Sequence, residues 1–334
     1  MAGMEKVSLI DHSIRQTSTS VTEFTGPLKN LELALRGVIR GNGEAVQLTL
    51  VALLARGHLL IEDVPGVGKT TLAHTLARSV NCQFQRVQFT SDLLPSDVVG
   101  VSVYNQHTEA FEFKPGPIFT NILLADEINR TTPKTQSALL EAMNERQVTV
   151  DNTTHKLPEP FMVVATQNPI EHHGTYPLPE SQLDRFLMRI RMGYPDKEAE
   201  REILKSDLHW NGLESLEPAA TSQQIHQWQK AVSTVSVESS LVDYMLTIVA
   251  KTRSHENLSL GVSPRGSQSL HRAAQALAFL ESRNYCIVDD FKRLVLPVFA
   301  HRMVVNSRYS STLKKSEQAE SILKNILETI EVPL

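Results

Sequence analysis

Short apolar runs and amphipathic stretches take turns along the first half of the chain. Helical spacing of apolar side chains predicts helices over residues 42–57 and 69–79, and a third that begins at Pro133. Short apolar runs predict buried strands at residues 58–62, 121–125 and 161–165, and a further strand is expected at residues 84–89. This order predicts an α/β fold with a parallel sheet flanked by helices.

The strand pattern stops after Tyr194 and Pro195, and only helical patterns follow. A capping box at Thr221 and Gln224, and a first-turn Pro264, support two of these helices. We expect helices near residues 197–208, 221–233, 237–252, 264–282, 289–301 and 316–330. The last helix has an apolar stripe that should pack on its own domain. The chain is therefore predicted to comprise a polar leader (1–24), an α/β core (25–195) and a smaller all-α domain (196–334).

Two segments of the core resemble hairpins inserted between its main elements. Residues 147–158, with the sequence QVTVDNTTHKLP, have a hairpin-like pattern. A second hairpin is expected after a helix at Asp92–Asp97, with Phe111 and Phe113 on one face. Such rings could contact a substrate, but packing of the two rings is the simpler interpretation.

The segment VPGVGKTT follows the first predicted strand and starts the next helix. Gly66 and Gly68 let successive N–H groups point inward, which makes an anion nest at a helix N-terminus. Lys69 would bridge the β- and γ-phosphates of ATP, and the Thr70 hydroxyl would bind Mg²⁺. Asp63 stands where the usual motif has its first glycine. The predicted nucleotide-binding residues here are Val64, Pro65, Gly66, Val67, Gly68, Lys69, Thr70 and Thr71.

Polar residues also follow two later strands. Asp126 ends an apolar strand and would hold Mg²⁺ mostly through its water shell, while Glu127 would activate the water that attacks the γ-phosphate. Asn168 follows another strand and is placed to orient that water or sense the γ-phosphate. An acid pair alone could cap a helix and Asn-Pro alone could form a turn. Downstream of a phosphate loop, both are predicted to belong to one catalytic site.

Composition narrows the class of protein further. The formal net charge is −4, which gives no overall basic field for nucleic acid. The two cysteines, Cys82 and Cys286, have no metal-ligand spacing and should be reduced. His172 and His173 are adjacent in an expected loop and should diverge, which disfavours a shared metal. No apolar run is as long as a membrane span and no signal-peptide pattern is present, so we expect a cytoplasmic protein.

Eight segments together resemble the MoxR family of AAA+ ATPases. They are EDVPGVGKT, QFTSDLLPSD, KPGPIFTN, LLADEINR, PKTQSALLEAMNERQVTVD, ATQNP, GTYPLPESQLDRF and GVSPRG. The resemblance spans roughly residues 25–305. In that family, Asp63 is an accepted replacement for the first glycine of the loop.

The resemblance implies roles for three more polar residues. Asn168 would be sensor 1, Arg265 sensor 2, and Arg185 the arginine finger given to a neighbouring subunit. Ser263 and Pro264 at a helix start support Arg265, because a cation in a first turn opposes the helix dipole unless an anion binds there. From the residues alone, Arg185 could equally form an ion pair with Asp184 that holds a loop.

The family also implies a hexameric ring that remodels or matures client complexes, sometimes in metal-cofactor insertion, often with a von Willebrand factor A domain partner. A nucleic-acid motor is an alternative, but the predicted hairpin tips, NQHTE and DNTTHK, are nearly neutral. A nucleotide-switched binding scaffold without turnover is a second alternative, which the intact Glu127 disfavours. Should Arg185 prove structural, Arg189 is the next finger candidate.

Overall fold

The computed structural model describes residues 24–169, 174–205, 216–306 and 312–333. Nearly all of the predicted leader, together with His172 and His173, lies outside these residues. The core of the fold is a five-stranded sheet in the order β2-β5-β8-β1-β9, with all neighbours parallel. The strands are β1 (Leu59–Glu62), β2 (Phe84–Gln88), β5 (Ile122–Asp126), β8 (Met162–Gln167) and β9 (Met188–Ile190). The predicted parallel sheet is confirmed, and β9 is an additional edge strand.

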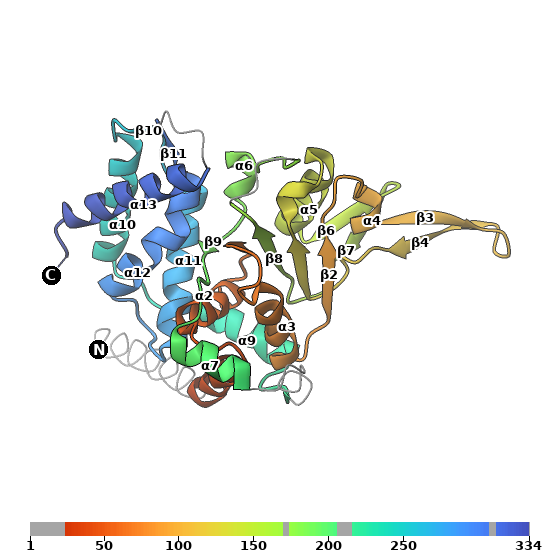
Figure 1. The fold of residues 1–334 in the computed structure, drawn as a ribbon, viewed down its shortest axis with the longest axis horizontal. Helices are drawn as coiled ribbons and strands as arrows, with labels where there is room; N and C mark the ends of the chain where they lie inside the picture. The colour runs from red at the N-terminus through yellow and green to blue at the C-terminus, as the bar shows by residue number, and fades with distance from the viewer. Residues whose placement is uncertain (1–23, 170–173, 206–215, 307–311, 334) are drawn as a thin grey trace, which may run out of the picture.

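Helices cover both faces of this sheet (Figure 1). Alternate strand residues face opposite ways, so Leu124 joins one buried cluster and Leu123 the other. The first cluster includes α2 (Gly43–Leu54) and α3 (Lys69–Ser79), and the second includes α5 (Pro133–Glu145). The central strands β1, β5 and β8 are therefore buried on both faces, which explains why their sequences are largely apolar, whereas the edge strand β2 has exposed polar residues.

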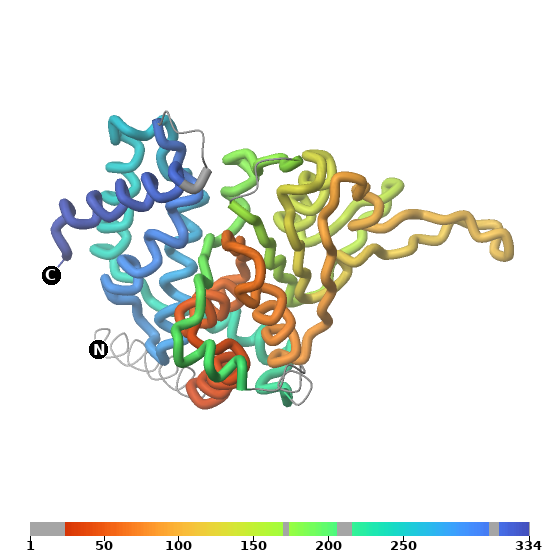
Figure 2. Tube along the Cα trace, viewed as in Figure 1, coloured from red at the N-terminus to blue at the C-terminus, as the bar shows by residue number. Residues whose placement is uncertain are grey.

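Two antiparallel hairpins lie outside the sheet. The first follows α4 (Pro95–Val99) and consists of β3 (Gly100–Asn105) and β4 (Ala110–Pro115); it extends away from the body (Figure 2). The second consists of β6 (Gln147–Val150) and β7 (Thr153–Lys156). Phe113 stacks on His155 of the second hairpin at 3.9 Å between ring centroids. Phe111 meets the edge of Tyr104 yet stays 74% exposed, so the packing expectation holds for Phe113 and is wrong for Phe111.

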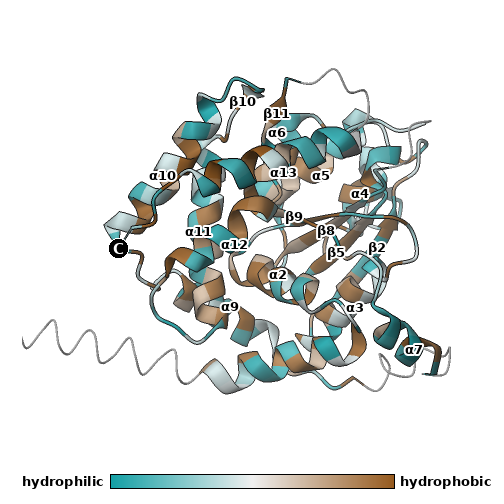
Figure 3. Ribbon diagram, turned by 60° about the vertical axis from the view of Figure 1, so that its left-hand side comes forward, coloured by the Kyte–Doolittle hydropathy of each residue, from teal (hydrophilic) through white to brown (hydrophobic). Residues whose placement is uncertain are grey.

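The rest of the described chain is mainly helical. After α6 (Glu180–Leu183) come α7 (Lys197–Lys205), α9 (Ser222–Val232), α10 (Ser239–Arg253), α11 (Pro264–Leu280), α12 (Val288–Phe299) and α13 (Thr312–Glu328). Apolar and polar residues alternate along α10 and α13 (Figure 3), and the stripe of α13 packs inside its own region through Ile322, Leu323 and Ile326. A short ribbon joins β10 (Leu258–Leu260) to β11 (Val304–Val305). In the described part of the chain, no helix has the length and apolar character needed to cross a membrane.

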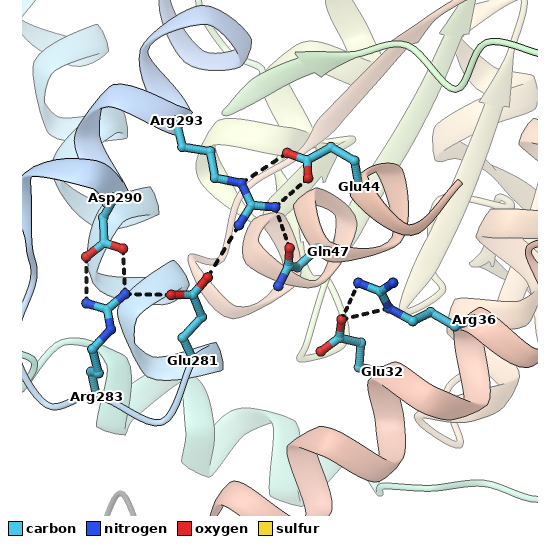
Figure 4. A network of polar contacts seen from close by, with 8 residues as sticks. All are labelled: Glu32, Arg36, Glu44, Gln47, Glu281, Arg283, Asp290 and Arg293. Atoms are coloured by element: carbon cyan, nitrogen blue, oxygen red, sulfur yellow. Dashed lines mark hydrogen bonds and ion pairs between the residues drawn. The ribbon is translucent and has the colours of Figure 1, made fainter. Parts of the chain in front are cut away.

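A polar network attaches α2 to the later helices (Figure 4). Arg293 of α12 donates from Nε to Glu44 of α2 at 3.1 Å and from Nη1 to Glu281 at 3.3 Å. Glu281 in turn accepts from Arg283 at 2.7 Å. Because α2 also shares its buried cluster with α9 and α11, the helical region packs directly on the face of the sheet that α2 and α3 cover.

Candidate nucleotide site

The predicted phosphate loop lies between the end of β1 and the start of α3. Gly66 and Gly68 have φ of 86° and 92°, in the left-handed region that favours glycine. A Cβ added at Gly66 would have no heavy atom within 4 Å, so the backbone there is open to an incoming ligand. The Lys69 ammonium donates to the carbonyl oxygens of Asp63 at 2.7 Å and Val64 at 3.2 Å. The Lys69 side chain therefore lies along the loop that is predicted to bind phosphate.

The acid pair ends the buried strand β5, next to β8. Asp126 is 8% exposed, and its Oδ1 accepts from the Thr166 hydroxyl of β8 at 2.6 Å. The same hydroxyl oxygen accepts from the Glu127 backbone N–H at 2.9 Å. Glu127 has a φ of 56°, an uncommon value for a residue with a side chain. Thr166 therefore holds both the Asp126 carboxylate and the backbone of Glu127.

Strand β2 supplies further contacts to both acids. Arg86 donates to Asp126 Oδ2 from Nε at 3.1 Å and from Nη2 at 2.6 Å. Gln88, two residues along the same strand, donates from its side-chain amide to a carboxylate oxygen of Glu127. Glu127 also pairs with Arg130 at 3.3 Å. Neither Arg86 nor Gln88 was predicted from the sequence, because their role depends on β2 lying beside β5.

Asn168 follows β8 directly and is 7% exposed. Since β8 lies between β5 and β1, the carboxyl ends of these strands bring Asn168 between the acid pair and the phosphate loop. Thr70 lies in the first turn of α3, directly after the phosphate loop. Carboxylate and hydroxyl oxygens are ligands that suit Mg²⁺, so Thr70 and Asp126 fit a magnesium site by their chemistry.

Arg185 and Arg265 belong to a second group of residues. The Ser263 hydroxyl caps α11 by accepting from the Gly266 N–H at 3.1 Å, and it donates to Asp184 at 3.1 Å. This bond joins the residue before Arg185 to the helix start that carries Arg265. The Ser263 cap and first-turn Pro264 are confirmed. Arg265 itself is exposed, whereas Arg185 donates to the Leu140 carbonyl oxygen at 2.6 Å.

The ion-pair partner of Asp184 is Arg302, a residue that no sequence pattern singled out. Its Nε donates to Asp184 at 2.8 Å, and its guanidinium also bonds the carbonyl oxygens of Phe186 at 2.6 Å and Leu187 at 3.1 Å. Burial lowers the pKa of Arg302 to about 10, while Asp184 opposes that shift. The ion pair considered between Asp184 and Arg185 is therefore replaced by one between Asp184 and Arg302.

Arg189, the second finger candidate, is wrongly placed for that role. Its side chain is 9% exposed and lies between Glu62, at 3.1 Å, and Glu320 of α13, at 3.0 Å. Burial lowers its pKa, while both glutamates oppose the change. A guanidinium held between two carboxylates inside one subunit cannot reach the site of a neighbour.

Three features define the P-loop nucleoside triphosphatases: a glycine-bearing loop after β1, an acid pair at the end of β5, and a polar residue after the intervening β8. The helical region that follows is typical of the AAA+ branch. Residues 58–188 match the model of the ATPase family associated with various cellular activities (AAA), and residues 250–326 match the AAA lid domain. The chain belongs to the MoxR family of AAA+ ATPases.

Three similar proteins illustrate this relationship. The chain is 50% identical to the uncharacterized protein YeaC of Bacillus subtilis, over 89% of this chain and 92% of that protein. It is 40% identical to Chaperone MoxR1 of Mycobacterium tuberculosis, over 90% and 80% respectively. The crystal structure of a candidate ATPase from Cytophaga hutchinsonii has a TM-score of 0.85 and 35% identity, and covers 97% of this chain and 99% of that one. The fold and the ATPase class predicted from the sequence are thereby confirmed.

Proposed function

We propose that this ATPase works in the cytoplasm as a hexameric ring and uses Mg²⁺-dependent ATP hydrolysis to remodel or mature client protein complexes. Insertion of a metal cofactor into a client, and cooperation with a von Willebrand factor A domain protein, are forms that this activity would take. Similarity to a protein named as a chaperone supports the client-directed part. We further propose that residues 25–195 form the catalytic core and residues 196–334 the lid, in line with the two family matches.

The observation that carries the proposal is the Thr166 bridge between Asp126 and Glu127. It supports two separate roles for adjacent carboxylates, because Asp126 is held by the Thr166 hydroxyl at 2.6 Å, while Glu127 has a positive φ and its carboxylate contacts Gln88 and Arg130 instead. Bound Mg²⁺ would neutralise phosphate charge beside Thr70 and Asp126. Glu127 would accept the proton of the attacking water, with Asn168 orienting that water. Lys69 would move from the Asp63 carbonyl to the phosphates.

Two arginines would complete the site, one from the helical region and one from a neighbouring subunit. Arg265 would bind the phosphates as sensor 2, and Arg185 would reach the γ-phosphate of the adjacent subunit as an arginine finger. The bond between Asp184 and Ser263 supports a common arrangement of the two segments that carry them. A finger supplied in this way makes turnover depend on ring assembly.

Glu127→Gln tests the proposal. The amide cannot act as a base, so this variant should bind a fluorescent ATP analogue as the wild type does while its turnover falls by at least about a hundredfold. Lys69→Ala should lose binding, because the phosphates lose their main monovalent counter-charge. Affinity purification of tagged Glu127→Gln with ATP should retain client proteins that the Lys69→Ala protein does not. Equal ATPase rates for Glu127→Gln and wild type would exclude the role of Glu127, and identical protein recovery with both variants would contradict ATP-dependent client capture.

A further inference from the structure

Asp63 connects the phosphate loop to the chain segment that leads into the helical region. It directly precedes the loop and is 9% exposed. Its Oδ1 accepts from the Val64 N–H at 2.8 Å, and its Oδ2 accepts from the backbone N–H groups of Met192 at 2.8 Å and Gly193 at 2.7 Å. Met192 and Gly193 follow β9 and precede α7. One carboxylate therefore joins two segments that are far apart in the sequence.

The contacts explain why an aspartate serves here better than a glycine. Asp63 is absent from the positive-φ residues of the described chain, so the backbone makes no demand for glycine at this position. Two carboxylate oxygens provide the acceptors that three N–H groups need. A glycine would leave those donors, including the buried Met192 N–H, without this partner, and an unsatisfied buried N–H is costly.

Met192 also reaches the other end of the loop. Its side chain is 7% exposed, and its terminal methyl would lie 3.8 Å from a Cβ added at Gly68. The Met192 backbone thus bonds the residue before the loop while its side chain approaches the loop's last glycine. A phosphate bound between these two ends of the loop would hold both ends in place, together with the Met192–Gly193 segment.

The neighbouring Glu62 forms a separate ion pair with β9, the strand that directly precedes Met192 and Gly193. Its carboxylate is 3.1 Å from Arg189 of β9, which pairs in turn with Glu320 of α13 at 3.0 Å. The last residue of β1 and the first residue after it therefore both bind the β9 segment. The carboxylates of Glu62 and Asp63 thus provide two separate connections between the start of the phosphate loop and the segment that leads to the helical region.

We propose that Asp63 is a positioning residue: it holds the phosphate loop ready for nucleotide and couples nucleotide binding to the Met192–Gly193 segment that leads to the lid. The proposal rests on the proposed nucleotide site. A carboxylate that orders the loop before nucleotide arrives raises the fraction of binding-competent protein, and apparent affinity scales with that fraction. By the same linkage, bound nucleotide stabilises the bonds of Asp63 to Met192 and Gly193.

The test compares wild type with Asp63→Asn. The amide has nearly the same shape, but it replaces one acceptor oxygen by a donor. If its oxygen faces Met192 and Gly193, its NH₂ group faces the Val64 N–H, and the flipped amide creates the opposite mismatch. Asp63→Asn should weaken binding of a fluorescent, non-hydrolysable ATP analogue about tenfold or more, the size of one lost hydrogen bond to a charged group. Asp196→Asn is the matched control, since the Asp196 carboxylate accepts from the helix-start N–H of Ala199 at 2.8 Å and lies outside the phosphate loop.

Hydrogen exchange supplies the readout that a merely structural role would not move. The analogue should slow exchange at the Met192 and Gly193 amides in wild type and in Asp196→Asn, and should do so much less in Asp63→Asn. Unchanged affinity in Asp63→Asn, or no nucleotide-dependent protection of these amides in wild type, would overturn the proposal. The wild-type measurement decides the matter even if Asp63→Asn does not fold. Failure of wild type itself to bind the analogue better than Lys69→Ala would instead count against the proposed nucleotide site.

Discussion

Arg86 and Asp126 form an ion pair across neighbouring strands, with Arg86 Nη2 2.6 Å from Asp126 Oδ2. The carboxylate proposed to hold the Mg²⁺ water shell is thus in contact with a guanidinium whose side chain is 50% exposed. Mg²⁺ and the Arg86 guanidinium compete for the Asp126 carboxylate. Arg86→Gln should therefore lower the Mg²⁺ concentration that gives half-maximal ATPase activity. Because the Arg86 side chain is half-exposed and its charge is screened by solvent, the pair is worth on the order of 1 kcal/mol, which corresponds to a shift of about fivefold. The measurement is ATPase rate against Mg²⁺ at saturating ATP.

Arg36→Gln provides the matched control for this prediction. Arg36 forms an exposed pair with Glu32 within one helix, so its loss changes the net charge equally without touching the site. We expect its Mg²⁺ dependence to equal that of wild type. A half-maximal concentration that rises in Arg86→Gln would show that Arg86 assists the site in its loaded state, contrary to the competition argued here.

His58 should make the stability of the protein depend on pH. Its Nδ1 accepts from the Val163 N–H at 3.0 Å and its Nε2 lies 3.0 Å from the Met143 carbonyl oxygen, which together require the neutral ring. Burial lowers the pKa of His58 from 6.5 to about 4. The unfolded chain therefore binds a proton that the folded chain does not, so stability is full above pH 6.5 and falls as the pH decreases from 6.5 to 4. Between pH 7 and pH 5 the loss should be about 2 kcal/mol.

Urea unfolding at a series of pH values checks this expectation. In His58→Gln the same pH change should cost about 2 kcal/mol less, even though the variant is less stable at pH 7. His107→Gln is the control, because His107 is exposed in the turn between β3 and β4. Parallel pH dependences for wild type and His58→Gln would contradict the assignment of this effect to His58.

The sequence predicted the central strands β1, β5 and β8 because each one is buried on both faces and is therefore largely apolar. It did not predict β9, a three-residue strand with Arg189 at its centre. A charged residue is tolerated there because Glu62 and Glu320 lie on either side of it. Those partners come from distant parts of the chain, and no local pattern reveals them.

A similar division applies to the candidate site. The phosphate loop and the acid pair are local motifs, so their residues could be identified along the chain. The contacts that orient them come from neighbouring strands, through Arg86, Gln88 and Thr166, and depend on the strand order. Likewise an ion pair between Asp184 and the adjacent Arg185 was one of two equal alternatives from the sequence, whereas the actual ion-pair partner of Asp184 is Arg302. The sequence offered no sign of Arg302, because this residue comes close to Asp184 only when the helical region folds back.

The last prediction concerns Arg185, whose side chain donates to the Leu140 carbonyl oxygen at 2.6 Å. If Arg185 is the finger of the neighbouring site, Arg185→Ala should leave nucleotide binding intact and reduce turnover by on the order of 10³ or more. Loss of one hydrogen bond to a carbonyl would instead cost about 1–3 kcal/mol of stability. Mixing Arg185→Ala with Lys69→Ala subunits should restore activity, because some interfaces then join an intact Lys69 to an intact Arg185. Mixing Glu127→Gln with Lys69→Ala should restore none, since both residues act within one subunit. No rescue in the first mixture, in rings shown to exchange subunits, would assign Arg185 to holding Leu140 within its own subunit.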